Sequence, residues 1–171
     1  EEAGVVYHWD HAYCEGHYYM YFGVVPVFLA FLPYRLLTGE PLTTYHATQF
    51  FVAVFIAGVF CLFRLLCRLF FKKLPFTVYL SLSVAVAAMS VFFACAEPAL
   101  YCTAITAALA LEIWSLYFFI KAVYVEQREN RQILLAAIGA LFGALVFGCR
   151  PPIALANVLV IPILATFLRQ R

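Results

Sequence analysis

The chain has 171 residues, of which 66% are hydrophobic and only 12% are charged, and its mean hydropathy is +0.95. A soluble domain of this length needs far more polar surface, so the composition excludes a soluble globular protein. The formal charge of +2 is spread over several loops rather than gathered in one patch, so it gives no sign of a nucleic-acid partner, and we expect none. The sequence instead predicts an all-α fold, a polytopic bundle of transmembrane helices.

The N-terminal part joins a polar head to a short apolar run. Residues 9–33 read WDHAYCEGHYYMYFGVVPVFLAFLP, and nowhere else do acids, histidines and tyrosines crowd together beside an apolar run. Gly23, Pro26 and Pro33 interrupt the run, and proline removes a backbone donor and clashes with the preceding turn. We therefore predict a short juxtamembrane or re-entrant helix with its polar lead-in at the water interface. A full span over residues 20–38, with the first nineteen residues in the cytoplasm, stays open as the alternative.

Five apolar runs follow, and each approaches the ~20 residues that cross a hydrocarbon core. They cover residues 47–71, 76–96, 99–124, 132–149 and 152–168. We predict one transmembrane domain over residues 1–171, with an outer loop and juxtamembrane helix in 1–46 and five spans in 47–171. The chain begins without an initiator methionine and ends directly after an apolar run, so we expect it to be an internal piece of a longer protein.

Basic residues set the expected orientation. Nine of the eleven Lys and Arg residues lie after the first span, around the connection of the third to the fourth span, or at the end of the chain. They are Arg64, Arg68, Lys72, Lys73, Lys121, Arg128, Arg131, Arg169 and Arg171. The positive-inside rule puts these three places in the cytoplasm. Only Arg35 and Arg150 then lie on the outer face of the plasma membrane.

The six cysteines form no C-x-x-C pair and show no zinc spacing. Cys95 and Cys102 flank a short loop and are placed to bridge. We nevertheless expect no disulfide, because an apolar membrane protein does not need a covalent cross-link for stability.

The polar head holds the first candidate site. His8, His11, His17, Asp10 and Glu15 could ligate a divalent metal or act as acid and base at neutral pH. The simpler interpretation, which we favour for the histidines, is a hydrated interfacial loop whose aromatic side chains form a membrane-interface belt. Asp10 stands between aromatic residues ahead of a glycine turn, where the membrane surface would partly desolvate it. A carboxylate there could have a raised proton affinity and serve as a base.

Arg150 is the most specific single-residue candidate for a binding site. It lies at the outer end of a span, against the positive-inside trend, between Gly148-Cys149 and Pro151-Pro152. Its planar guanidinium is well placed to bind a phosphate or pyrophosphate at headgroup level through paired hydrogen bonds. The alternative is an interfacial arginine that snorkels to lipid phosphate. Arg35 could share the same anion.

Glu112 lies about thirteen residues into its span, near the middle of the bilayer. An ionisable group at that depth is costly and is a functional candidate by default. The alternative is a structural carboxylic acid that is hydrogen-bonded to a neighbouring helix. Gly139 and Gly143, four residues apart in the next span, we interpret as structural, because small residues permit close helix packing.

Three segments together resemble a known family. Asp10–Tyr19, DHAYCEGHYY, leads into Gly23-Val24-Val25-Pro26, Leu37-Thr38-Gly39-Glu40 makes a short outer turn, and residues 139–152 read GALFGALVFGCRPP. They resemble the first outer loop, the following turn and a glycine-rich span of the multi-pass GT-C type glycosyltransferases, which are mannosyltransferase-like. The likeness is closest to uncharacterised bacterial members.

The resemblance implies an enzyme of the bacterial cell envelope that takes a sugar from a polyprenyl-phosphate donor on the extracytoplasmic face. It makes Asp10 the candidate for acceptor activation and Arg150 the candidate for donor-phosphate binding. The family's usual catalytic acid follows a first span that this chain lacks, which leaves room for a base upstream of Glu1. Glu97 is a loose counterpart of the acidic residue that often begins a later span.

The leading hypothesis is therefore an inverting sugar transfer, in which arginine, with or without a divalent metal ion, stabilises the departing lipid phosphate. The sugar, the acceptor and the metal requirement stay open. One alternative is a transporter or flippase of a lipid-linked intermediate, which needs polar groups along a path through the bilayer. Glu112 and Asn157 are the only such residues deep within spans. Another alternative is a non-catalytic membrane subunit.

Overall fold

The computed structural model describes residues 11–20, 23–96 and 99–169. The regular secondary structure of this part is helical apart from one short hairpin, and five helical stretches are long and apolar enough to cross a membrane. Four are single helices, α2 (Thr44–Phe70), α3 (Phe76–Ala96), α4 (Leu100–Tyr124) and α5 (Glu129–Phe147). The fifth, Pro151–Arg169, joins α6 (Pro151–Ala154), a 3-10 segment η2 (Leu155–Leu159) and α7 (Val160–Arg169).

The predicted transmembrane bundle is confirmed, and each predicted span begins and ends within three residues of the observed helix. The boundaries agree because helix-ending residues and charged residues separate the spans in the sequence. Phe71 ends the hydrogen-bonding pattern of α2 just before a lysine pair and Pro75, and Pro151 begins the fifth stretch at a position where its missing N–H costs nothing.

The short helix after the polar head is also confirmed. It consists of a π-helical segment η1 (Val27–Phe31) followed by α1 (Leu32–Thr38), together about 18 Å long and too short to cross a bilayer. Pro33 has no backbone N–H to donate to the preceding turn, and the wider π-helical turns of η1 lie just before it. Gly39 ends α1 in the left-handed conformation at φ 78°, and its N–H donates to the Arg35 carbonyl.

The polar head contains a hairpin that the sequence did not predict. Strands β1 (His11–Cys14) and β2 (His17–Met20) pair antiparallel, with Cys14 opposite His17. Glu15 at φ 50° and Gly16 at φ 84° form the two-residue turn. Positive φ at both turn positions matches the twist of the strands and makes a tight connection possible.

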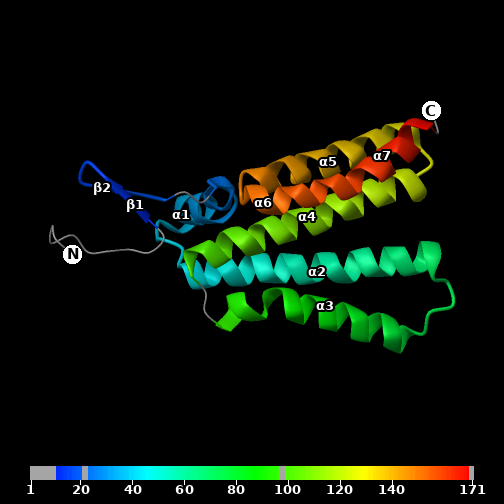
Figure 1. Cartoon of the computed structure of the whole chain (residues 1–171), viewed down its shortest axis with the longest axis horizontal. Helices are drawn as coiled ribbons and strands as arrows, with labels where there is room; N and C mark the ends of the chain where they lie inside the picture. Colours follow the sequence, from blue (N-terminus) through cyan, green and yellow to red (C-terminus); the bar gives the residue numbers. More distant parts are fainter. Residues whose placement is uncertain (1–10, 21–22, 97–98, 170–171) are drawn as a thin grey trace.

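Helix α4 is the centre of the bundle, between α2 on one side and α5 with α7 on the other (Figure 1). Its buried faces are rich in alanine, which lets neighbouring backbones approach closely. Polar ties cross both interfaces. The Trp114 Nε1–H donates to the Val54 carbonyl of α2 at 3.0 Å, and the Ser115 hydroxyl donates to the Gly139 carbonyl of α5 at 2.8 Å.

The two glycines of α5 have the structural role expected of them. A Cβ at Gly139 would lie 3.0 Å from the Phe119 ring, and a Cβ at Gly143 would lie 2.5 Å from the Asn157 amide oxygen of η2 and 3.1 Å from the Ser115 hydroxyl oxygen of α4. All three distances are tighter than ordinary packing. Each glycine therefore allows α5 to approach α4 where a larger residue would hold it away, and Gly143 also makes room for Asn157 of η2.

The bundle has two chemically different ends (Figure 1). The hairpin end holds the hairpin, η1, α1, the starts of α2, α4 and α6, and the ends of α3 and α5. The basic end holds the α2–α3 and α4–α5 connections and the end of α7. Arg35 and Arg150 belong to the hairpin end, and the other eight described Lys and Arg residues belong to the basic end.

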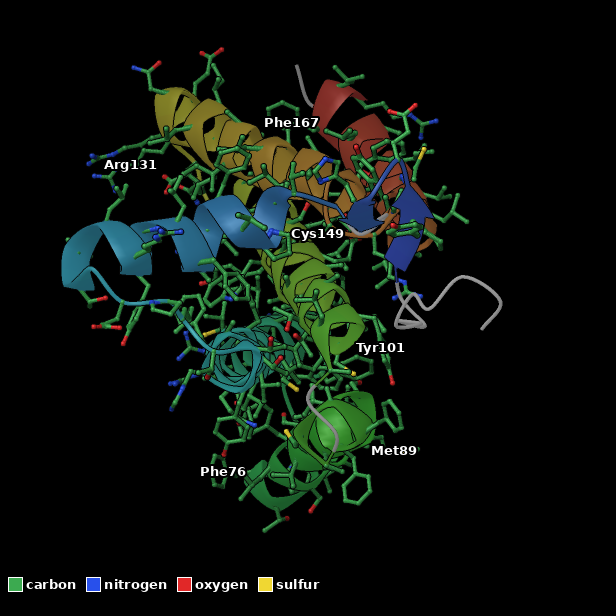
Figure 2. The ribbon with its side chains drawn as sticks, turned by 90° about the vertical axis from the view of Figure 1, so that its left-hand side faces the viewer. Phe76, Met89, Tyr101, Arg131, Cys149 and Phe167 are labelled. Carbon is green, nitrogen blue, oxygen red and sulfur yellow. The ribbon has the colours of Figure 1, made fainter. Side chains whose placement is uncertain are left out.

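The start of the juxtamembrane segment is docked on the turn between α5 and α6. The Gly23 N–H donates to the Cys149 carbonyl at 3.2 Å, and the Val25 N–H donates to the Gly148 carbonyl at 3.3 Å. A Cβ at Gly23 would overlap the Gly148 carbonyl, so only glycine allows this approach. Figure 2 shows Cys149 at this junction, beside the ribbon of the short helix.

Replacing Gly23 with Ala should push the juxtamembrane segment off this turn. We expect the free energy of unfolding to fall by about 1–3 kcal/mol, the range for overpacked sites, and the buried Cys149 thiol to become reactive toward a water-soluble maleimide. Peptide mapping of the labelled protein resolves Cys149 from the other cysteines. The control is Val24→Ala, because Val24 is exposed. Unchanged protection of Cys149 in the Gly23→Ala variant would contradict the docking.

Candidate functional site

The backbone of Arg150 is fixed from both sides. Its N–H donates to the Val146 carbonyl at 3.0 Å, and its own carbonyl accepts from the Ile153 N–H at 3.0 Å. Two prolines follow at the start of α6, where their φ is already helical. Arg150 thus sits at a rigid corner between two spans.

Arg150 is partly buried, and its Nη1 is buried with no hydrogen-bond partner among the described residues. Leaving a charged donor unpaired and out of water is costly. Such a group gains most from an anionic oxygen, and a planar guanidinium can offer paired N–H groups to a phosphate. Among the predicted site residues that the structure describes, Arg150 therefore has the clearest anion-binding geometry.

The surroundings of Arg150 on the bundle side are apolar and uncharged. The neighbouring Cys149 is buried in a cluster with Val25, Leu111 and Val146. Burial raises the pKa of the Cys149 thiol to about 12, so the thiol stays neutral. An anion bound at Arg150 would meet no competing negative charge from this neighbour, and the low local polarity would strengthen its attraction to the guanidinium.

The other predicted residues of the hairpin end lie apart from Arg150. Arg35 is exposed on α1, ten residues after the docked Val25 and roughly 15 Å further along the helix. Glu15 and His17 are exposed at the tip of the hairpin. Asp10 and Glu97 lie outside the described residues.

The described residues contain no group of three His, Cys, Asp or Glu side chains placed to hold a metal ion. No disulfide joins the described cysteines, and Cys95 is exposed whereas Cys102 is buried in α4.

Glu112 is the second feature of interest. It is the thirteenth of the 25 residues of α4, its side chain is 6% exposed, and neither carboxyl oxygen has a hydrogen-bond partner among the described residues. Ser115, one turn further along α4, faces α5. The structural alternative predicted for Glu112, a hydrogen bond to a neighbouring helix, is not seen among these residues.

Asn157, the other polar residue deep in a span, is used structurally. Its Nδ2 donates to the Gly143 carbonyl at 3.0 Å and ties η2 to α5. This bond uses one of the two amide N–H groups that Asn157 could offer to a polar path through the bilayer.

One polar pair was missed by sequence reasoning. The hydroxyl groups of Thr48 in α2 and Thr103 in α4 are hydrogen-bonded at 2.7 Å, and both residues are fully buried near the hairpin end. Each threonine lies near the start of an apolar run, beside other polar residues, so the sequence offered no distinct signal for this pair. The pairing itself depends on which helices are neighbours, and the sequence pattern does not specify this.

A scan against protein-family models, a search of curated proteins and a search of solved structures each find no match for this chain.

Replacing Glu112 with Met should stabilise the fold. The change removes two buried oxygens without partners and keeps a similar volume, so we expect the free energy of unfolding in detergent to rise by about 1–3 kcal/mol. The contrasting control is Ser115→Ala on the same side of α4, which removes a satisfied hydrogen bond and should lower stability by about 1 kcal/mol. A loss of stability in Glu112→Met would mean that the carboxyl group has a structural partner.

Proposed function

We propose that this protein is a membrane glycosyltransferase of the hexosyltransferase type. It moves a sugar from a polyprenyl-phosphate donor to an acceptor at the extracytoplasmic face of the bacterial plasma membrane. The observation that carries the proposal is the guanidinium of Arg150, whose buried Nη1 has no partner among the described residues. This group lies at the end of the bundle where spans, short helix and hairpin meet (Figure 1).

The distribution of charge supports the outward orientation of the hairpin end. That end carries two of the ten described Lys and Arg residues, and the basic end carries eight. The positive-inside rule assigns the basic end to the cytoplasm and therefore the hairpin end to the opposite side.

The short helix supports a lipid-linked substrate. Its exposed side chains are largely apolar, with Phe28 at 61%, Leu36 at 76% and Leu37 at 86% exposure. A helix that is too short to span and is apolar on its exposed surface is stable where it meets lipid. The start of this helix is docked beside Arg150, so a polyprenyl chain could lie along the helix while its phosphate reaches the guanidinium.

The proposed chemistry is a single displacement. The acceptor hydroxyl oxygen forms a bond to the anomeric carbon as the bond from that carbon to the lipid-phosphate oxygen breaks. The electron pair leaves with the lipid phosphate, and Arg150 stabilises the negative charge that develops there. A carboxylate takes the hydroxyl proton, and the family resemblance gives this role to Asp10.

A transporter or flippase of a lipid-linked intermediate is the second candidate, and Glu112 favours it. A deeply buried carboxyl group without a partner is expected along an ion or substrate path. The commitment of the Asn157 amide to Gly143 weakens this candidate. A transfer assay separates the two, because a transporter yields no glycosylated acceptor.

Replacing Arg150 with Ala in the full protein should reduce sugar transfer about 100-fold or more, as loss of one donor to a developing anion does. Arg150→Lys should recover only part of the activity, since lysine keeps the charge but not the paired donors. Incorporation of radiolabelled sugar from a polyprenyl-phosphate donor measures this. Arg131→Ala, at the basic end, is the control and should keep full activity. Full activity of Arg150→Ala would remove the phosphate-binding role.

The proposed orientation predicts which cysteines an impermeant reagent reaches from outside intact cells. The natural Cys14, which is exposed in the hairpin, should be labelled. A cysteine introduced at Lys72 or Arg128 should react only after the cells are opened. The reverse pattern would place the hairpin end in the cytoplasm and overturn the proposed function.

A further inference from the structure

A groove of about 620 Å³ opens between α2 and α3 at the basic end. We call it the basic groove. Three cations line it, Arg64, Arg68 and Lys72, and the apolar part of its wall includes Phe60, Phe76 and Tyr79. It lies at the opposite end of the bundle from Arg150, so it is separate from the site described above.

The helical repeat explains why the two arginines share this groove. Phe60, Arg64 and Arg68 are spaced four residues apart and therefore lie along one face of α2. Helix α2 has 27 residues and is about 40 Å long, whereas the hydrocarbon core is about 30 Å thick. The last turn of α2, which holds Arg68, therefore extends beyond the hydrocarbon core, and Arg64 lies one turn before it, where a long side chain can extend to the headgroups.

The apolar wall is fixed by contacts between the two helices. The Tyr79 hydroxyl of α3 donates to the Phe60 carbonyl of α2 at 3.1 Å, and the two rings meet edge to face with 6.3 Å between centroids. Phe76 packs on Tyr79 at 5.8 Å. The groove thus has an ordered aromatic wall close to its cations.

No acidic residue lines the basic groove, and none of its three cations forms an ion pair within the described part of the chain. The acidic residues described at the basic end are Glu126 and Glu129, which lie at the α4–α5 connection. The Glu126 carboxylate already accepts hydrogen bonds from the backbone N–H groups of Gln127 and Arg128. Three cations facing one groove repel each other, and a bound anion would relieve this repulsion.

An apolar track leaves the groove along α3. Phe76, Leu80 and Val84 are four residues apart on one face, and they are 72%, 40% and 50% exposed. Figure 2 shows Phe76 on the outer side of α3. A ligand that combines a negative headgroup with a long apolar chain fits both parts of this surface.

We propose that the basic groove binds an anionic phospholipid of the leaflet at this end. Arg64, Arg68 and Lys72 hold the headgroup phosphate, and one acyl chain follows Phe76, Leu80 and Val84. Basic pockets between spans are where such headgroups bind in membrane proteins. Because the groove and Arg150 lie at opposite ends, lipid binding here does not depend on the proposed sugar transfer.

The test uses the full protein and two double variants that each remove two positive charges from the same end. Arg64→Gln with Arg68→Gln alters the groove, and Arg128→Gln with Arg131→Gln alters only the α4–α5 connection. Each protein is placed in phosphatidylcholine nanodiscs with or without a minor fraction of phosphatidylglycerol. Native mass spectrometry after release measures the retained phosphatidylglycerol, and thermal unfolding measures the stabilisation it provides.

We expect the unaltered protein to retain phosphatidylglycerol and to unfold at a higher temperature with it. The groove variant should bind about 10- to 30-fold more weakly, and the loop variant should bind nearly as well as the unaltered protein. Equal losses in both variants would mean general attraction to surface charge and would overturn the site. Unchanged binding by the groove variant would also overturn it. Equal stabilisation by free inorganic phosphate would assign the groove to a soluble anion instead of a lipid.

Discussion

The close approach of α2 and α5 to opposite sides of α4 is the constraint on which the bundle depends. In lipid, apolar surface alone does not hold helices together, and association comes from tight packing with a few interhelical hydrogen bonds. Helix α4 supplies alanines and buried hydroxyl groups on both sides. The glycines of α5 leave the space that a larger side chain would fill at this interface. Helices α3 and α7 are arranged around this three-helix centre.

The hairpin end acquires its geometry from backbone contacts instead of side-chain chemistry. Gly23 and Val25 pair with the turn at Gly148 and Cys149, which joins the beginning of the described chain to a corner more than a hundred residues later. The rigid corner fixes Arg150, and the docked segment directs the short helix away from it. The guanidinium that we propose to bind an anion and a short helix with exposed apolar side chains are thereby joined in one unit.

Much of the fold could be predicted because bilayer thickness imposes a length on every span. Arg150 could be singled out because it lies against the charge bias of the other basic residues. The hairpin was missed, since the tyrosines and histidines of its strands also suit an interfacial loop and its turn depends on a left-handed Glu15. The Thr48–Thr103 bond was missed because it depends on which helices pack together. The roles expected of Asp10 and Glu97 remain predictions, because both residues lie outside the part of the chain that the structure describes.

The 3-10 segment within the last span changes how far that span reaches. A 3-10 turn rises about 2.0 Å per residue against 1.5 Å in an α-helix, so the five residues Leu155–Leu159 extend the stretch by about 2.5 Å. The 19 residues Pro151–Arg169 therefore cover about 31 Å instead of about 28 Å. That length equals the thickness of a typical hydrocarbon core, and the chain gains it without an added residue and without thinning the surrounding bilayer.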